Sequence, residues 1–117
     1  MKILALDDHW QDIAPVLNAY LAGDQIVYSA SPREAHKLLK TQEFDLLLLD
    51  GNLGGDLTGP AVLREWKAEG LGLPPVVMLS ADDYLIRDGI AAGAIDGINK
   101  DEIYSSTFTK LKAKLAT

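Results

Sequence analysis

Several short apolar stretches of the 117-residue sequence run directly into side chains capable of acid–base or phosphate chemistry. In chain order, these side chains are Asp7, Asp8, Asp50, Ser80 and Lys100. Four consecutive leucines precede Asp50 and form the most apolar stretch in the chain. Because a short apolar run without alternation is typical of a strand buried on both faces, we expect each of these side chains where a strand ends.

Three carboxylates, one hydroxyl and one ammonium group would support phosphate chemistry if these strand ends lie together. Carboxylates in one pocket repel each other, so at least one pKa would rise unless a cation neutralised them. An oxygen-only ligand set favours a hard ion, and few carboxylates with room for water suit Mg²⁺ better than Ca²⁺. Lys100 would neutralise part of the cluster or bind an anion, and Ser80 would donate a hydrogen bond. Phosphoryl transfer to a carboxylate requires these groups.

The elements that must position these side chains alternate along the chain. Apolar runs predict strands over residues 2–6, 25–30, 45–49, 76–80 and 95–99. Helical spacing with cap and stop signals predicts helices over residues 9–22, 32–42, 60–69, 82–92 and 101–115. This alternation implies an α/β fold with a parallel sheet, right-handed crossovers and helices on both faces. Ligands of such sheets bind at the carboxyl ends of the strands, where the side chains above would converge.

Local signals mark the starts of the helices. The segment SPRE has the pattern of a capping box, with Ser31 as the cap and Pro32 in the first helical position. Pro15 falls early in the first helix, which tolerates it if the first turn starts near Asp12 and is otherwise kinked. Ser80 could itself cap the helix that follows it, which is the structural alternative to a binding role.

Composition and charge exclude several classes of function. The length fits one domain over residues 1–117, without a separate output domain. The absence of cysteine excludes a disulfide framework, a thiolate zinc site and a thiol nucleophile. The formal net charge of −6 argues against a nucleic-acid partner held by its phosphates. The apolar start meets Asp7 too early for a signal peptide or membrane span, so we expect a cytoplasmic protein without membrane contact.

In this order and on these elements, the residues resemble the receiver domain of two-component response regulators over essentially the whole chain. The match rests on the pair Asp7-Asp8, on Asp50, on Ser80-Ala81 and on Lys100. The segments GNLGGDLTG after Asp50 and GAIDGINK up to Lys100 also resemble family segments. The resemblance implies a flavodoxin-like, doubly wound sheet of five parallel strands in the order 2-1-3-4-5 with five helices.

The resemblance also implies a phosphoacceptor and a set of Mg²⁺ ligands. Asp50 would take a phosphoryl group from the phosphohistidine of a histidine kinase and form an acyl phosphate. Asp8 would bind Mg²⁺ directly, and Asp7 would act mainly through a metal-bound water. Asp50 itself and the backbone carbonyl of Asn52 would complete the protein ligands.

Further residues would bind the phosphoryl group and set its lifetime. Lys100 would pair with the phosphoacceptor and then with a phosphoryl oxygen. Ser80 would move to bond the phosphoryl group, and the Ala81 N–H would add a contact. Asn52 and Asp82 match positions that tune how fast water hydrolyses the acyl phosphate.

The implied partners are a sensor histidine kinase or phosphotransfer protein, and a downstream protein. The downstream protein would bind a face formed by the helix over 82–92, the strand over 95–99 and the helix over 101–115. Ile90, Ile98 and Tyr104 lie on these elements. The acyl phosphate would switch this face.

The chain departs from the family pattern at two positions. Gly97 stands three residues before Lys100, where the family often has an aromatic residue that swings inward on phosphorylation. Asp101 follows the lysine, where the family commonly has a proline in a cis bond. Gly97 motivates an alternative function: a receiver-like protein-interaction domain whose output is independent of phosphate or otherwise atypical.

Two further alternatives are weaker on the residues alone. A phosphatase with an aspartate nucleophile would need a second aspartate two residues after Asp50, where Asn52 stands, so we expect a phosphoacceptor rather than a turnover enzyme. His9, beside the acidic pair, could bind a metal, but its position at a helix start favours an exposed residue.

Overall fold

The computed structural model describes residues 1–116 and contains a five-stranded parallel sheet. The strands are β1 (Lys2–Leu6), β2 (Gln25–Ser29), β3 (Leu46–Asp50), β4 (Val76–Ser80) and β5 (Asp96–Asn99). They pair in the order β2-β1-β3-β4-β5. The flavodoxin-like order is therefore confirmed, and every predicted strand boundary holds to within one residue.

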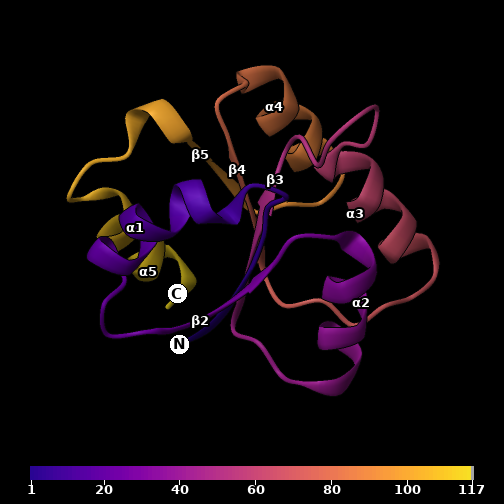
Figure 1. Ribbon diagram of the computed structural model, residues 1–117, viewed down its shortest axis with the longest axis horizontal. Helices are drawn as coiled ribbons and strands as arrows, with labels where there is room; N and C mark the ends of the chain where they lie inside the picture. The colour runs from indigo at the N-terminus through magenta and orange to yellow at the C-terminus, as the bar shows by residue number, and fades with distance from the viewer. Residues whose placement is uncertain (117) are drawn as a thin grey trace.

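Helices cover both faces of this sheet (Figure 1). Their bounds are α1 (Trp10–Tyr20), α2 (Pro32–Thr41), α3 (Gly59–Ala68), α4 (Asp83–Ala91) and α5 (Thr107–Leu115). Figure 1 shows α1 and α5 on one side of the sheet and α2, α3 and α4 on the other. Because all the strands are parallel, their carboxyl ends lie along one edge, as the alternation of elements predicts.

The core consists of two apolar layers separated by the sheet. Every residue of β3 and β4 is buried, as expected for central strands covered on both faces. Alternate side chains point to opposite layers: Leu47 and Met78 belong to one, and Leu48 and Val77 pack in the other with Phe108 of α5. The last residues of these strands, and hence the candidate site, are held by the most buried part of the molecule.

The prediction of one final helix over 101–115 is wrong. The chain first forms a 3₁₀ helix, η1 (Lys100–Glu102), and α5 begins only at Thr107. Asn99 caps η1, because its Oδ1 accepts a hydrogen bond from the Asp101 N–H (2.8 Å). Thr107 Oγ1 accepts another from the Tyr104 N–H (2.9 Å). Such short-range bonds from side chain to backbone compete with a continuous helix and favour a turn.

The sequence signals at the starts of α2 and α1, the Ser31 cap and the position of Pro15, have different outcomes. Ser31 Oγ accepts a hydrogen bond from the Glu34 N–H (3.2 Å), which confirms the predicted cap of α2. Helix α1 begins at Trp10, so the alternative of a first turn near Asp12 is wrong and Pro15 lies inside the helix. Within residues 1–116, no helix is long and apolar enough to cross a membrane.

Candidate functional site

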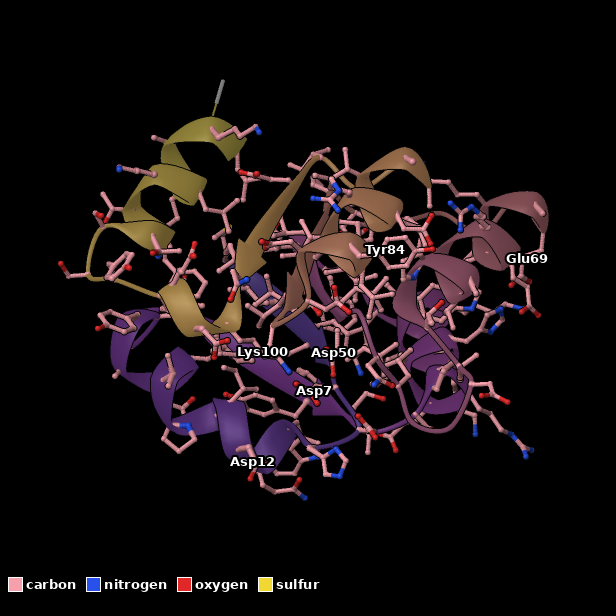
Figure 2. All side chains as sticks on the ribbon, turned by 90° about the horizontal axis from the view of Figure 1, so that it is seen from above. Asp7, Asp12, Asp50, Glu69, Tyr84 and Lys100 are labelled. Atoms are coloured by element: carbon pink, nitrogen blue, oxygen red, sulfur yellow. The ribbon has the colours of Figure 1, made fainter. Side chains whose placement is uncertain are left out.

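The carboxyl ends of the strands border an open cavity of about 840 Å³. In Figure 2, Asp7, Asp50 and Lys100 lie close together at this edge of the sheet. The lining includes all the site residues named from the sequence: Asp7, Asp8, Asp50, Asn52, Ser80, Ala81, Asp82 and Lys100. The fold thus brings together residues that lie up to 93 positions apart in the chain.

Lys100 lies between the two buried carboxylates of the cavity. Its Nζ is 2.8 Å from Asp7 Oδ2 and 3.4 Å from Asp50 Oδ1. Only 4% of Asp7 and 7% of Asp50 is exposed. Since a buried charge is costly unless it is paired, the ammonium group compensates both carboxylates. The family resemblance implied a pair with Asp50, whereas the shorter contact is with Asp7.

The Asp50 carboxyl has a pKa raised from 3.8 to about 6. Burial is the largest cause, the charge of Lys100 acts in the opposite direction, and the charge of Asp7 raises the pKa further. Burial alone would lower the pKa of Lys100, but the hydrogen bond to Asp7 and the charge of Asp50 outweigh it and raise that pKa. The lysine therefore stays charged, and a second cation in the cavity would favour ionised Asp50.

Ser80 ends β4 and is 4% exposed. Its Oγ accepts a hydrogen bond from the Asp82 N–H (3.1 Å). Asp82, and not Ser80, caps α4, because its carboxylate accepts a hydrogen bond from the Tyr84 N–H (2.9 Å). A Cβ at Gly51 would lie 2.8 Å from Ser80 Oγ, so the glycine leaves space for the hydroxyl. The serine hydroxyl thus lies between the cavity and the start of α4.

The loop after β3 brings backbone groups to the cavity. The Asn52 N–H donates a long hydrogen bond to Asp50 Oδ1 (3.4 Å from nitrogen to oxygen). Asn52 Oδ1 accepts a hydrogen bond from the Gly54 N–H (3.1 Å). Gly54 has φ +99°, and a Cβ there would lie 3.1 Å from Asp8 Oδ2. A glycine is therefore needed for this loop to turn so close to the Asp8 carboxylate.

The pocket offers donors that suit a hard divalent cation. Asp7, Asp8 and His9 each have a potential ligand atom within 4.8 Å of the others. His9 Nδ1 lies 3.2 Å from Asp8 Oδ2, yet 76% of the His9 side chain is exposed, as its position at a helix start predicts. Carboxylates predominate, and Asp50 adds a desolvated one, so the residues fit Mg²⁺ by donor chemistry.

Several lining residues were not predicted as site residues from the sequence. They are Asp12, Gly54, Gly55, Asp83 and Leu85, and His9, which was expected only as an exposed residue, lines the cavity as well. Asp12 lies in the first turn of α1, where the helix dipole also favours an acidic residue, so its type alone does not mark it as a lining residue. Asp83 is the first residue of α4, directly after the Asp82 cap. The cavity therefore has a more acidic rim than the family motif alone indicates.

A family model described as the response regulator receiver domain matches residues 3–112. The fold, with its cavity at the strand ends, is that of this class of signalling domain. The chain belongs to the response regulator receiver domain family. All the lining residues of the cavity fall within the matched range.

Solved structures share this fold. A two-component response regulator from Clostridium difficile is 24% identical, with 99% of this chain and 96% of that chain covered and a TM-score of 0.81. The chemotaxis protein CheY4 from Vibrio cholerae is 24% identical, with 97% of each chain covered and a TM-score of 0.77. NtrX from Brucella abortus is 26% identical over 97% of this chain and 26% of its own, with a TM-score of 0.78. No curated protein sequence matches the chain.

Proposed function

We propose that this chain is a phosphorylation-controlled signalling module in which Asp50 accepts a phosphoryl group. The donor is the phosphohistidine of a sensor kinase or phosphotransfer protein, and the location is the cytoplasm. The observation that carries the proposal is the setting of Asp50, a buried carboxylate at a central strand end, in a cavity and 3.4 Å from Lys100 Nζ. Membership of the receiver family supports it.

In the proposed reaction, a carboxylate oxygen of Asp50 attacks the phosphorus of the phosphohistidine. A P–O bond forms and the P–N bond breaks, and its electron pair leaves with the imidazole, which takes one proton from water. Only the ionised carboxylate is nucleophilic. With a pKa of about 6, Asp50 is mostly ionised near pH 7 even before a further cation enters the cavity.

Three groups of this chain would bind the transferred phosphoryl group. Lys100 moves its ammonium contact from Asp50 Oδ1 to a phosphoryl oxygen. Ser80 turns its hydroxyl toward the phosphoryl group, and the Ala81 N–H adds a third donor. Asn52 and Asp82 line the same cavity, where their size and polarity would control the access of water to the acyl phosphate.

Mg²⁺, when bound, would neutralise the carboxylates and the phosphoryl oxygens. Asp8, Asp50 and the Asn52 carbonyl would hold it directly, and Asp7 through water. The hydrogen bonds of Asp7 support its indirect role: Oδ1 accepts one from the His9 N–H and Oδ2 one from Lys100 Nζ, both at 2.8 Å. Both oxygens of Asp7 are thus already engaged by the protein.

Incubation of the purified chain with Mg²⁺ and acetyl phosphate tests the proposal. The intact mass should increase by one phosphoryl group, and Asp50→Asn should abolish the increase. Asp12→Asn is the matched control, because it removes a different carboxylate from the lining of the same cavity. A folded wild-type protein that gains no phosphoryl group under these conditions would refute the assignment of Asp50.

The downstream protein would bind the face formed by α4, β5 and α5. Large apolar side chains are exposed on or beside these elements: Tyr84, Ile90, Ile95 and Tyr104. Of the residues named from the sequence, Ile90 and Tyr104 are therefore exposed, whereas Ile98 is only 7% exposed and belongs to the core. The formal net charge of −6 supports a protein partner over a nucleic acid.

Gly97 favours a second candidate function, a receiver-like interaction domain whose output does not depend on phosphate. This candidate predicts that a beryllofluoride mimic of the phosphoryl group changes the cavity but leaves α4 and the partner face unchanged. Amide chemical shifts of the labelled protein, measured with and without the mimic, distinguish the two functions.

A further inference from the structure

Helix α4 packs directly against β4 and β5. Two glycines at this contact have no side chain, and the close approach leaves no room for one. A Cβ at Gly97 would collide with Cγ2 of Ile86, and a Cβ at Gly89 would collide with the side chain of Met78. Met78 and Gly97 are paired in the sheet. Ile86 therefore occupies the space where a side chain at position 97 would begin. No ring can move there, so a change at Ser80 has to reach α4 by another route.

The Asn99 side chain offers such a route. Asn99 is paired with Ser80 in the sheet and directly precedes Lys100 in the chain. Its Nδ2 donates a hydrogen bond to Asp83 Oδ1 in the first turn of α4 (2.9 Å). Its Oδ1 accepts one from the Asp101 N–H in η1 (2.8 Å). One amide group thus ties the backbone that carries Lys100 to the start of α4.

A second contact holds the same end of α4. Ser80 Oγ accepts its hydrogen bond from the N–H of Asp82, the residue that caps the helix. If the serine hydroxyl turned toward a phosphoryl group, the Asp82 N–H would lose this acceptor. Both side chains that would contact the phosphoryl group are therefore linked to the start of α4 by hydrogen bonds, Ser80 directly and Lys100 through the adjacent Asn99.

We propose that Asn99, through Asp83, transmits the state of the phosphoryl site to α4 in this chain. The inference rests on the proposed function of Asp50. A phosphoryl group on Asp50 draws Lys100 toward it, the Asn99–Asp83 hydrogen bond carries this movement to the helix, and release of the Asp82 N–H frees the helix to follow. Asn99 is a positioning residue, since it acts through Lys100 and α4 and does not contact the phosphoryl group.

The test compares amide chemical shifts of the whole labelled chain with and without Mg²⁺ and beryllofluoride. In the wild-type protein, shifts are expected around the cavity and along α4. In Asn99→Ala, the shifts around the cavity should remain, and those of α4 should fall to the size seen in the distant edge strand β2. The mass gain of this variant with acetyl phosphate should equal that of the wild-type protein. A general structural defect would reduce the mass gain as well.

Two further variants make the result specific. Asp83→Ala removes the acceptor and should cause the same loss of α4 shifts, and the double variant should lose no more than either single one, because the two side chains act through one bond. Asn18→Ala is the matched control. It removes an asparagine that also makes a 2.9 Å hydrogen bond, with Tyr28, away from the site, and should respond like wild type.

The outcomes separate this inference from the proposed function. Full α4 shifts in both Asn99→Ala and Asp83→Ala would overturn the coupling and leave the phosphoacceptor role of Asp50 intact. A wild-type protein that is phosphorylated without any α4 shift would also overturn it, and would favour a phosphate-independent output. A wild-type protein that gains no phosphoryl group would overturn the function of Asp50 and the coupling with it.

Discussion

The cavity at the strand ends and the contact between α4 and β5 lie beside each other, yet they differ in how closely they follow the family pattern. In the cavity, Asp50 and Lys100 lie together, as the sequence predicts. In the α4–β5 contact, Gly97 departs from the aromatic residue that the family resemblance implies, and Ile86 fills the space beside it. The comparison indicates that the residues of the cavity and the packing between α4 and β5 can vary separately.

The physical reason lies in what holds each region together. The cavity depends on charges at defined distances, since buried carboxylates need a cationic partner and their pKa values depend on the neighbouring charges. The α4–β5 contact depends on apolar packing, in which different side chains can fill the same volume. Charge and pH should therefore perturb the cavity, and changes of volume should perturb the contact.

Asp50→Asn should have the largest effect on stability, and the effect should depend on pH. The pKa of Asp50 is higher in the folded protein than its ordinary value, so the folded state holds this proton between about pH 4 and pH 6. The contribution of Asp50 to stability is full below about pH 4 and is lost as pH rises through about 6. Without metal, Asp50→Asn should raise the free energy of unfolding by about 3 kcal/mol at pH 7.5 and little at pH 4.

Urea unfolding in the presence of EDTA measures this difference. Asp12→Asn, an exposed carboxylate of the same cavity, should show no comparable gain between the two pH values. A gain for Asp50→Asn that is equal at pH 4 and pH 7.5 would mean that the titration of Asp50 is not its cause. Added Mg²⁺ should reduce the advantage of the variant at pH 7.5, because it stabilises the wild-type carboxylates.

Lys100→Met should have the next largest effect, in the opposite direction. The variant leaves the buried Asp7 and Asp50 without their cationic partner, and the 24% exposure of the lysine side chain moderates the cost. We expect the free energy of unfolding to fall by about 2 kcal/mol in EDTA at pH 7.5. Lys110→Met, on the exposed side of α5, is the control and should change it little. An equal loss of stability in the two variants would contradict the prediction that the charge of Lys100 stabilises the cavity.

Gly97→Ala tests the other side of the comparison. The added methyl group collides with Ile86, so stability should fall by about 1 to 2 kcal/mol, as in an overpacked core. In an Ile86→Ala background the same substitution should cost nothing, since the space is then free. Gly72→Ala, where a Cβ meets nothing within 4 Å, is the control. If Gly97→Ala stabilises the wild-type chain, α4 does not lie as close to β5 as we describe.

The fold and the cavity were largely predictable from the sequence, because short buried strands and their polar ends leave a strong local signal. The leucines before Asp50 predict a central strand, and the parallel order then brings Asp7 and Lys100 to the same edge. The cap at Ser31 was predictable for the same reason, since a capping box is a local pattern.

Features that depend on contacts between distant elements were not predictable. The space beside Gly97 is filled by Ile86 from a different element, and no local pattern indicates this. The hydrogen bond from Asn99 Nδ2 to Asp83 Oδ1 joins the end of β5 to α4 across 16 residues of sequence, and no local pattern indicates it either. The closer approach of Lys100 to Asp7 than to Asp50 likewise depends on the packed geometry.

The smallest expected effect concerns Asp82, which belongs to both regions because it lines the cavity and caps α4. Asp82→Ala and Ser31→Ala each remove one helix cap, and each should lower the free energy of unfolding by about 1 kcal/mol.

The two variants should differ in the lifetime of the phosphoryl group. Asp82→Ala should change the rate at which the acyl phosphate is lost, measured by intact mass over time, and Ser31→Ala should not. Equal rates in the two variants would mean that the Asp82 side chain does not control the loss of the acyl phosphate. The cavity and the α4–β5 contact would then be neighbours without a common functional residue.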